Sequence, residues 1–203
     1  MSTSPTEPAP TRGRGRPRSQ EAHEAILAAT VELLAAEGIL GTSMEAVAAK
    51  AGVAKTTVYR RWATKEELIV EAVTLIAPPG PPDDTGSFAG DLALLAREQI
   101  GRMSGTGVPL VAPRVIADSL GHPELHRLLN ERLIEPVRSV LAALVRRAIE
   151  RGEMRADTDV EIAVDVLHGV VIYNVLISGG QIHQLPDRAA RLASLLLDAF
   201  APV

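Results

Sequence analysis

The chain has 203 residues, enough to bury one large or two small hydrophobic cores, and its 21 basic and 25 acidic residues give a net charge of −4. This balance gives no general attraction to nucleic acid, so binding to a polyanion would depend on where the basic residues lie. Cysteine is absent, which excludes disulfides and thiolate metal sites. One Trp, two Tyr and two Phe leave any large cavity to be lined mostly by aliphatic side chains.

The first 18 residues are predicted to be a disordered basic arm. Residues 1–11 are rich in Ser, Thr and Pro and lack the apolar core of a signal peptide. In residues 12–18, four Arg alternate with Gly and Pro. Such a segment is either a solubilising tail or an arm that orders on DNA, and the helices that follow favour the arm. Arg14 and Arg16 are then candidate minor-groove contacts.

The next part of the chain has the pattern of four helices joined by short turns, expected over residues 20–37, 44–51, 55–62 and 65–76. Ser19 can cap the first helix, and Gly38 can end it. Thr42 and Thr64 each stand three residues before a glutamate, which is the spacing of a capping box at a helix N-terminus. The third helix has no such cap.

The second and third of these helices have the pattern of a helix-turn-helix. Gly52 can adopt the backbone conformation of a sharp turn between them. Val58, Tyr59 and Trp62 are predicted to anchor the third helix at helical spacing. Its outward face would then be basic and rich in hydroxyls, and would consist of Lys55, Thr56, Thr57, Arg60 and Arg61. Two helices packed across such a turn are typical of a DNA-binding unit.

Charges are segregated in the first 77 residues, which contain nine basic and nine acidic residues. All nine basic residues lie within 12–18 and 50–65, where no acid occurs. A solvated helix surface usually mixes the two signs, so this pattern predicts a positive surface for a polyanion. Arg60 can bind guanine through two hydrogen bonds or contact a phosphate without sequence preference. Lys65 opposes the dipole of its own helix, which a phosphate bound there would explain.

Residues 77–86 are rich in Pro and Gly and cannot be helical, so they mark a boundary between domains at 19–77 and 87–203. Helices are expected in the second domain over residues 87–103, 113–120, 123–151, 160–178 and 186–200. Pro136 should kink the long helix, because it cannot donate a hydrogen bond to the carbonyl of Arg132. No segment has a strand pattern, so the predicted fold class is all-α.

The segment 160–178 is apolar around nearly its whole circumference, but Glu161 and Asp165 make it unsuitable for a membrane. We therefore expect no membrane partner and a helix that is covered on several sides. The domain has little else to cover it, which predicts that this helix and the last one pack in a twofold homodimer. A monomeric bundle with a central helix is the alternative. The candidate interface residues are Val164, Val175, Leu192, Leu196 and Phe200.

No catalytic triad, phosphate-binding glycine loop or carboxylate pair stands out, so the chain is predicted not to be an enzyme and no cofactor is expected. His122 and His126 have a spacing that metal sites on helices use. Pro123 disturbs that geometry, and no third ligand is evident, so we predict no metal site.

These features make residues 19–76 resemble the DNA-binding domain of the tetracycline-repressor (TetR) family of bacterial regulators. The residues that carry the resemblance are Gly38, Thr42, Ser43, Val47, Ala48, Ala51, Gly52, Val53, Lys55, Thr57, Val58, Tyr59, Lys65 and Leu68. The rest of the chain is similar to the family only in length, helix pattern and position. Ala54 stands where the family usually has a hydroxyl residue, and Trp62 where Tyr or Phe is more usual.

The resemblance implies a homodimer whose last two helices form a four-helix interface, with a ligand cavity in each C-terminal domain. It implies that Thr42 or Ser43, Tyr59 and Lys65 contact phosphates of double-stranded DNA. It also implies that Lys55, Thr56, Thr57 and Arg60 lie near base edges. The expected cavity residues are Met103, Arg114, Leu120, His126, Leu167, His168, Val171, Tyr173 and Asn174. Of these, the polar groups of residues 168, 173 and 174 could instead bond across the dimer or to each other.

The predicted function is a ligand-responsive transcriptional regulator, in particular a repressor released from a palindromic operator by a small apolar effector. It is expected in the cytoplasm, associated with the nucleoid. An activator or a ligand-independent regulator of the same fold is one alternative. An all-α small-molecule carrier or enzyme, in which the basic segments are incidental, is the other.

Overall fold

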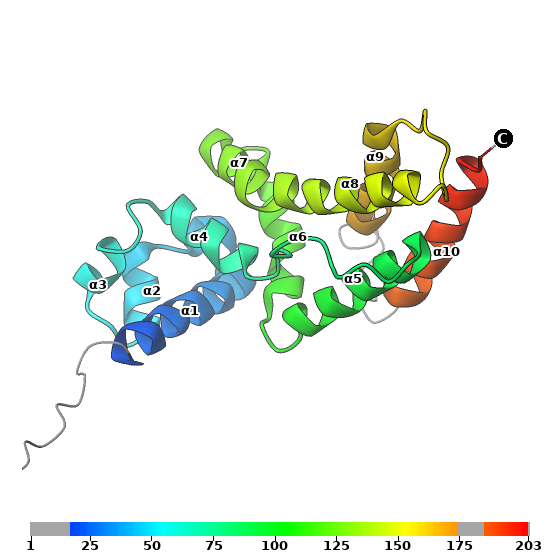
Figure 1. The fold of residues 1–203 in the computed structure, drawn as a ribbon. Coiled ribbons are helices and arrows are strands. Elements are labelled where there is room, and N and C mark those ends of the chain that lie inside the picture. Colours follow the sequence, from blue (N-terminus) through cyan, green and yellow to red (C-terminus); the bar gives the residue numbers. More distant parts are fainter. Residues whose placement is uncertain (1–16, 174–184, 203) are drawn as a thin grey trace, which may run out of the picture.

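The computed structural model of the chain describes residues 17–173 and 185–202 (Figure 1). The helices are α1 (Pro17–Gly41), α2 (Met44–Lys50), α3 (Lys55–Tyr59), α4 (Lys65–Thr74), α5 (Phe88–Met103), α6 (Val108–Ser119), α7 (Pro123–Leu129), the π-helical turn η1 (Asn130–Ile134), α8 (Glu135–Glu150), α9 (Val160–Ile172) and α10 (Leu185–Ala199). No strand occurs in the described ranges, and the predicted all-α fold is confirmed.

The molecule is elongated, with α1 to α4 at one end and α9 and α10 at the other (Figure 1). Helix α10 packs along α5, and α8 packs against α9 and α5. Helices α6 and α7 lie between the two ends, where they pack on α1 and α4. None of the helices within the described ranges has the length and apolar character needed to span a bilayer.

The apolar interior is divided into two cores, and the first crosses the predicted domain boundary at residues 77–86. It joins α1–α4 to residues of the C-terminal part such as Met103, Val111, Leu125 and Leu133. The second core is formed by α5, α8, α9 and α10 around the fully buried Phe88. The end formed by α1–α4 and the middle helices therefore share one packed interior, so a displacement of α6 or α7 acts directly on α1 and α4.

The start of α1 differs from the prediction. The helix begins at Pro17, because proline suits the first helical turn, where no backbone donor is needed. Ser19 therefore lies inside the helix and is not its cap. Its side-chain and backbone oxygens both accept hydrogen bonds from Nη2 of Arg61, at 2.8 and 2.7 Å. The candidate arm residues Arg14 and Arg16 lie outside the described residues.

The chain leaves the regular path of α1 at Gly38, which has φ 70° and ψ −171°. This conformation is essentially restricted to glycine, and it interrupts the helix where the sequence predicted its end. The capping box predicted at Thr42 is wrong. Ser43 is the cap of α2, with its hydroxyl accepting from the backbone N–H of Ala46 at 3.1 Å. The hydroxyl of Thr42 is buried and donates to the carbonyl of Gly38.

The capping box predicted at the start of α4 is present. The Thr64 hydroxyl accepts from the backbone N–H of Glu67 at 3.2 Å, and the Glu67 carboxylate accepts from the N–H of Ala63 at 2.9 Å. Helix α3 begins after Ala54 without a side-chain cap, as the sequence indicated. It is shorter than predicted and ends at Tyr59.

In the C-terminal part, α6 begins five residues before the predicted start at Pro113, because Pro109 occupies its first turn, where a missing donor costs nothing. The helix predicted over 123–151 is irregular where Pro136 was expected to disturb it. The backbone N–H of Glu135 bonds to the carbonyl of Asn130, five residues back, in the π turn η1. The turn accommodates the proline and lets the rod continue from α7 into α8.

A buried ionic network ties the segment after α4 to the end of α8. The Asp91 side chain is inaccessible to solvent and accepts hydrogen bonds from the N–H and hydroxyl of Thr85 at 2.8 and 2.7 Å. Arg151 and Arg147 lie 3.1 and 3.5 Å from its other oxygen. Burial alone would raise the pKa of Asp91, but the bonds from Thr85 and Arg151 outweigh it and hold the pKa below its ordinary value.

We predict that Gly38→Ala destabilises the protein by about 1–3 kcal/mol, because alanine is strained at this φ and ψ. The new Cβ would also approach Nη2 of Arg114, but that flexible side chain can move away. The measurement is the free energy of unfolding in urea. Gly52→Ala is the control, since Gly52 also has a positive φ of 67° but open space around it, and it should cost about 1 kcal/mol. A Gly38→Ala variant as stable as the wild type would contradict this account.

We predict that Asp91→Asn lowers stability at neutral pH by about 1–3 kcal/mol, because the two arginines lose their buried counter-charge. A carboxyl group whose pKa is lowered by folding stabilises the folded state fully above its unfolded pKa of about 4. That contribution disappears as the pH falls through the lower folded pKa. The difference between variant and wild type should therefore shrink in acid, as followed by thermal unfolding from pH 7 downwards. The exposed Asp83→Asn should show no such trend.

Candidate functional site

Most of the predicted outward face of α3 is accessible, except that Arg61 is hydrogen-bonded to Ser19 on α1. Lys55, Thr56 and Arg60 are exposed, and Thr57 is half-buried. None of these four side chains forms a hydrogen bond or ion pair with any residue that the structure describes. Beneath them, Val58 is completely buried and anchors the helix, as predicted. The face predicted to lie near base edges is therefore accessible to a partner.

Trp62, just after α3, is fixed by contacts that the sequence analysis did not foresee. Its ring is buried, and its Nε1 donates to a carboxylate oxygen of Glu71 on α4 at 2.6 Å. The other oxygen of Glu71 lies 3.3 Å from Nε2 of His23 on α1. The His23 ring stacks on Trp62 with centroids 5.5 Å apart. These contacts hold the end of the helix-turn-helix against both α1 and α4, so they set the orientation of α3.

Tyr59 does not anchor α3 as predicted, because its ring is 48% exposed. Its hydroxyl donates to Oε1 of Glu45 on α2 at 2.8 Å, across the turn. This hydrogen bond lowers the pKa of Glu45 and raises the pKa of Tyr59, because ionised tyrosine would lose its donor and face a carboxylate. The Tyr59 hydroxyl is thus at the surface, as a phosphate contact requires. In the free protein, however, it is already hydrogen-bonded to the Glu45 carboxylate.

The other predicted phosphate contacts differ in accessibility. Lys65 is half-buried, and its Nζ donates to the carbonyl of Ile39 at 3.0 Å, which leaves two of its three protons for another acceptor. Ser43 is partly exposed at the N-terminus of α2. Thr42 is only 1% exposed, so the prediction that either hydroxyl could contact phosphate reduces to Ser43.

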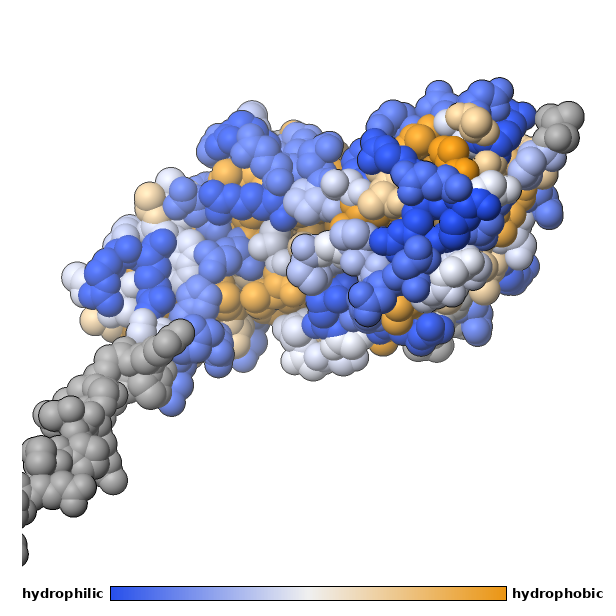
Figure 2. Space-filling view, viewed as in Figure 1, coloured by the Kyte–Doolittle hydropathy of each residue, from blue (hydrophilic) through white to orange (hydrophobic). Residues whose placement is uncertain are grey.

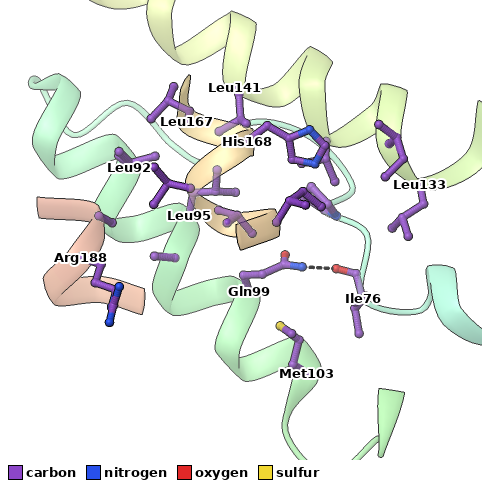
Figure 3. A pocket seen from close by; sticks show the side chains of 18 of the residues that line it. Ile76, Leu92, Leu95, Gln99, Met103, Leu133, Leu141, Leu167, His168 and Arg188 are labelled. Carbon is purple, nitrogen blue, oxygen red and sulfur yellow. Dashed lines mark hydrogen bonds between the residues drawn. The ribbon is translucent and has the colours of Figure 1, made fainter. Parts of the chain in front are cut away.

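A cavity of about 190 Å³ lies in the C-terminal part (Figure 3). Its wall comes from α5, α6, η1, α8, α9 and α10, together with Ile76 just after α4. Four of the predicted residues line it: Met103, Leu167, His168 and Val171. Figure 3 shows the His168 ring beside Leu141, with Gln99 and Met103 on the opposite wall.

Four other predicted cavity residues lie elsewhere. Arg114 is exposed, pairs with Asp118 on its own helix and lies against Gly38. Leu120 and Tyr173 are 76% and 59% exposed. His126 is not in the wall, and its Nδ1 lies 3.3 Å from the hydroxyl of Ser119. Asn174 lies outside the described residues.

Of the wall that α5 supplies, sequence reasoning predicted only Met103 and missed the residues before it. Leu92, Leu95, Gln99 and Met103 recur at helical spacing and face the cavity together. Gln99 was the available signal, since it interrupts an otherwise apolar stripe. Its Nε2 donates to the carbonyl of Ile76, and its Oε1 accepts from Arg102 at 2.8 Å. The cavity wall is thereby hydrogen-bonded to the end of α4 (Figure 3).

The predicted interface residues are mostly directed into the protomer. Val164 and Leu196 are 1% and 3% exposed within a single chain, so the prediction that they face a second subunit is wrong. Leu192 lines the cavity, and Phe200 packs partly buried against the second core. Val175 lies outside the described residues. Among the described residues of α9, its C-terminal cap and α10, the large exposed apolar side chains are Ile162, Val166, Val171, Tyr173 and Leu195. Figure 2 shows apolar surface over α9.

The helix-turn-helix, with its accessible basic helix, and the helical C-terminal part with its apolar cavity define a DNA-binding transcriptional regulator. Residues 26–72 match the family described as bacterial regulatory proteins, tetR family, and residues 82–196 match the tetracyclin repressor-like C-terminal domain. The chain belongs to the TetR family of transcriptional regulators. The predicted class is confirmed, and this family is one of DNA-binding regulators, not of enzymes.

Relatives and solved structures agree with this assignment. An uncharacterised HTH-type transcriptional regulator, YdeS of Bacillus subtilis, is 31% identical over 94% of this chain and 93% of its own. The DNA-binding transcriptional repressor TetR of Mycobacteroides abscessus is 31% identical over 82% of this chain and 86% of its own. The crystal structure of the TetR-family regulator SCO0332 has 30% identity and a TM-score of 0.61, covering 90% of this chain and 100% of that one.

We predict that Tyr59 titrates above the ordinary tyrosine pKa of about 10, because its ionisation breaks the bond to Glu45. The chain has only two tyrosines, so Tyr173→Phe isolates the signal. The measurement is the ultraviolet absorbance of the phenolate during an alkaline titration. Glu45→Ala removes the acceptor and should return the pKa of Tyr59 towards its ordinary value. If this substitution leaves the titration unchanged, the hydrogen bond does not govern the state of the hydroxyl.

Proposed function

We propose that the protein is a repressor that binds a palindromic DNA operator as a homodimer and is released by a small, largely apolar effector. The observation that carries this proposal is the outward face of α3. There, Lys55, Thr56 and Arg60 are exposed and unengaged by any described residue, while the helix itself is firmly anchored. Accessible donors on a fixed helix are what recognition in a major groove needs.

In the proposed complex, α3 lies in the major groove. Arg60 and Lys55 donate to base edges, with Thr56 and Thr57 beside them. Ser43, Tyr59 and Lys65 bind the flanking phosphates and fix the register of the helix. Tyr59 must exchange its bond to Glu45 for one to phosphate. Arg14 and Arg16 are proposed to follow the adjacent minor groove.

A second copy of the chain would place two α3 helices about 34–36 Å apart, or a little more, on successive major grooves. The exposed apolar side chains of α9 and α10, among them Ile162, Val166 and Leu195, support such a pairing, because they are large and uncovered in one protomer. Because its operator would lie on the chromosome, we propose that the protein acts in the cytoplasm, associated with the nucleoid.

The effector is proposed to act through α4. The cavity reaches Ile76 just beyond this helix, and Gln99 in the wall bonds to the Ile76 carbonyl. An occupant that displaces Gln99 or α6 would move α4 and, through the shared first core, α1 and α3. Release then follows if the effector binds the DNA-incompetent spacing more tightly than the competent one.

The test uses duplexes recovered from random DNA by selection on the full-length protein. We predict that Arg60→Ala weakens binding to the recovered site by about 10- to 100-fold and relaxes its preference at one base position. Lys65→Ala should weaken binding to all duplexes alike and reduce the salt slope by about one unit. Fluorescence anisotropy at several salt concentrations measures both effects.

Arg146→Ala is the matched control. It removes the same charge from an arginine that is exposed and forms no ion pair with any described residue. This arginine lies on α8, far from α3. It should leave affinity and preference unchanged. Selection that recovers no preferred site, or equal losses with Arg60→Ala and Arg146→Ala, would refute recognition by α3. A reporter fused to the recovered site, tested with and without the gene, separates a repressor from an activator.

A further inference from the structure

The cavity wall has few polar side chains. Among its described residues only Gln99, His168 and Arg188 are polar, and the others are aliphatic side chains, Met103 and prolines. The described wall contains no carboxylate, and no Phe, Tyr or Trp. It therefore offers a cationic ligand neither a counter-charge nor an aromatic face. The loss of hydration of a buried cation would therefore not be compensated by any group of the described wall.

Two of the three polar groups are poorly placed for an occupant. The amide of Gln99 already donates to the Ile76 carbonyl and accepts from Arg102. Arg188 is exposed on α10, and Figure 3 shows its guanidinium at the edge of the cavity, directed away from His168. A charged ligand group would have to stay at that edge in contact with water.

His168 is the remaining polar group, and it is available. Its ring lies in the wall, and no residue that the structure describes forms a hydrogen bond with it. Burial lowers its pKa, nearby Arg138 lowers it further, and the opposing effects of Asp165 and Glu135 are smaller. At neutral pH the ring is therefore uncharged, with one nitrogen as donor and the other as acceptor. A partly buried imidazole without a partner gains from any ligand that supplies one.

We propose that the effector is an uncharged, mainly aliphatic molecule with one hydroxyl or carbonyl oxygen, and that this oxygen hydrogen-bonds to His168. This inference rests on the proposed effector cavity and specifies its occupant. An apolar cavity of about 150 Å³ accommodates benzene. The cavity here, at about 190 Å³, suits a short chain or a single substituted ring.

The experiment uses the full chain without DNA and measures dissociation constants by calorimetry. The probes share an eight-carbon chain and differ in the head group: 1-octanol, 2-octanone, octylamine and octanoate, with 1-chlorooctane as the probe without a comparable hydrogen-bonding group. We expect the alcohol and the ketone to bind at least about tenfold more tightly than the amine or the carboxylate, because the charged heads lose hydration in the apolar wall.

Two variants separate hydrogen bonding from shape. His168→Leu should weaken 1-octanol about five- to tenfold and leave 1-chlorooctane nearly unchanged. His168→Gln keeps a donor and an acceptor, so it should retain most of the affinity for 1-octanol. Arg188→Gln is the control at the edge of the cavity and should have no effect on the alcohol.

Three results would overturn the inference. His168→Leu could weaken 1-octanol and 1-chlorooctane equally, which would make His168 part of the shape only. Octanoate could bind best and depend on Arg188, which would assign the cavity to anions. The third result is that none of the probes binds, which would show that the cavity does not take such molecules. Operator binding is measured separately on DNA, so each of these failures is distinguishable from a failure of the proposed repressor function.

Discussion

The enclosure of α4 is the constraint on which the rest of the structure depends. Leu68, Ile69, Val70, Ala72 and Val73 are all completely buried, between α1 on one side and α6 and α7 on the other. A close-packed interior transmits displacement, because its side chains have few voids in which to relax. Position changes in the middle of the molecule therefore reach the DNA-binding end through packing alone.

Polar contacts also connect α4 to other parts of the molecule. Glu71 projects from α4 to both His23 and Trp62, so the orientation of α3 follows that of α4. Just after the C-terminus of α4, the carbonyl of Ile76 accepts a hydrogen bond from Gln99 in the cavity wall. Hydrogen bonds thus connect α4 and the residues just after it both to the helix-turn-helix and to the cavity wall. The contacts of Glu71 with His23 and of Ile76 with Gln99 join residues far apart in the sequence.

Features that depend on interactions between residues close in the sequence were predicted correctly. The helices, the capping box at Thr64, the irregularity at Pro136 and the basic face of α3 all depend on residues within a few positions of each other. The errors arose where tertiary contacts decide. An apolar helix such as α9 does not reveal which side is covered by its own chain, so Val164 was assigned to the wrong surface. The polar anchor Gln99 was missed because its partner is 23 residues away.

The π turn between α7 and α8 has a consequence for the geometry of the cavity. Residues of an α-helix advance by about 100° each, so one additional residue in a turn rotates everything after it by that angle. Helix α7 contributes its buried side chains to the first core, whereas α8 contributes its buried side chains to the second. The π turn rotates the buried face of α8 relative to that of α7, so that the two consecutive helices can pack into different cores. Leu133, within the π turn, and Leu141, in α8, both line the cavity.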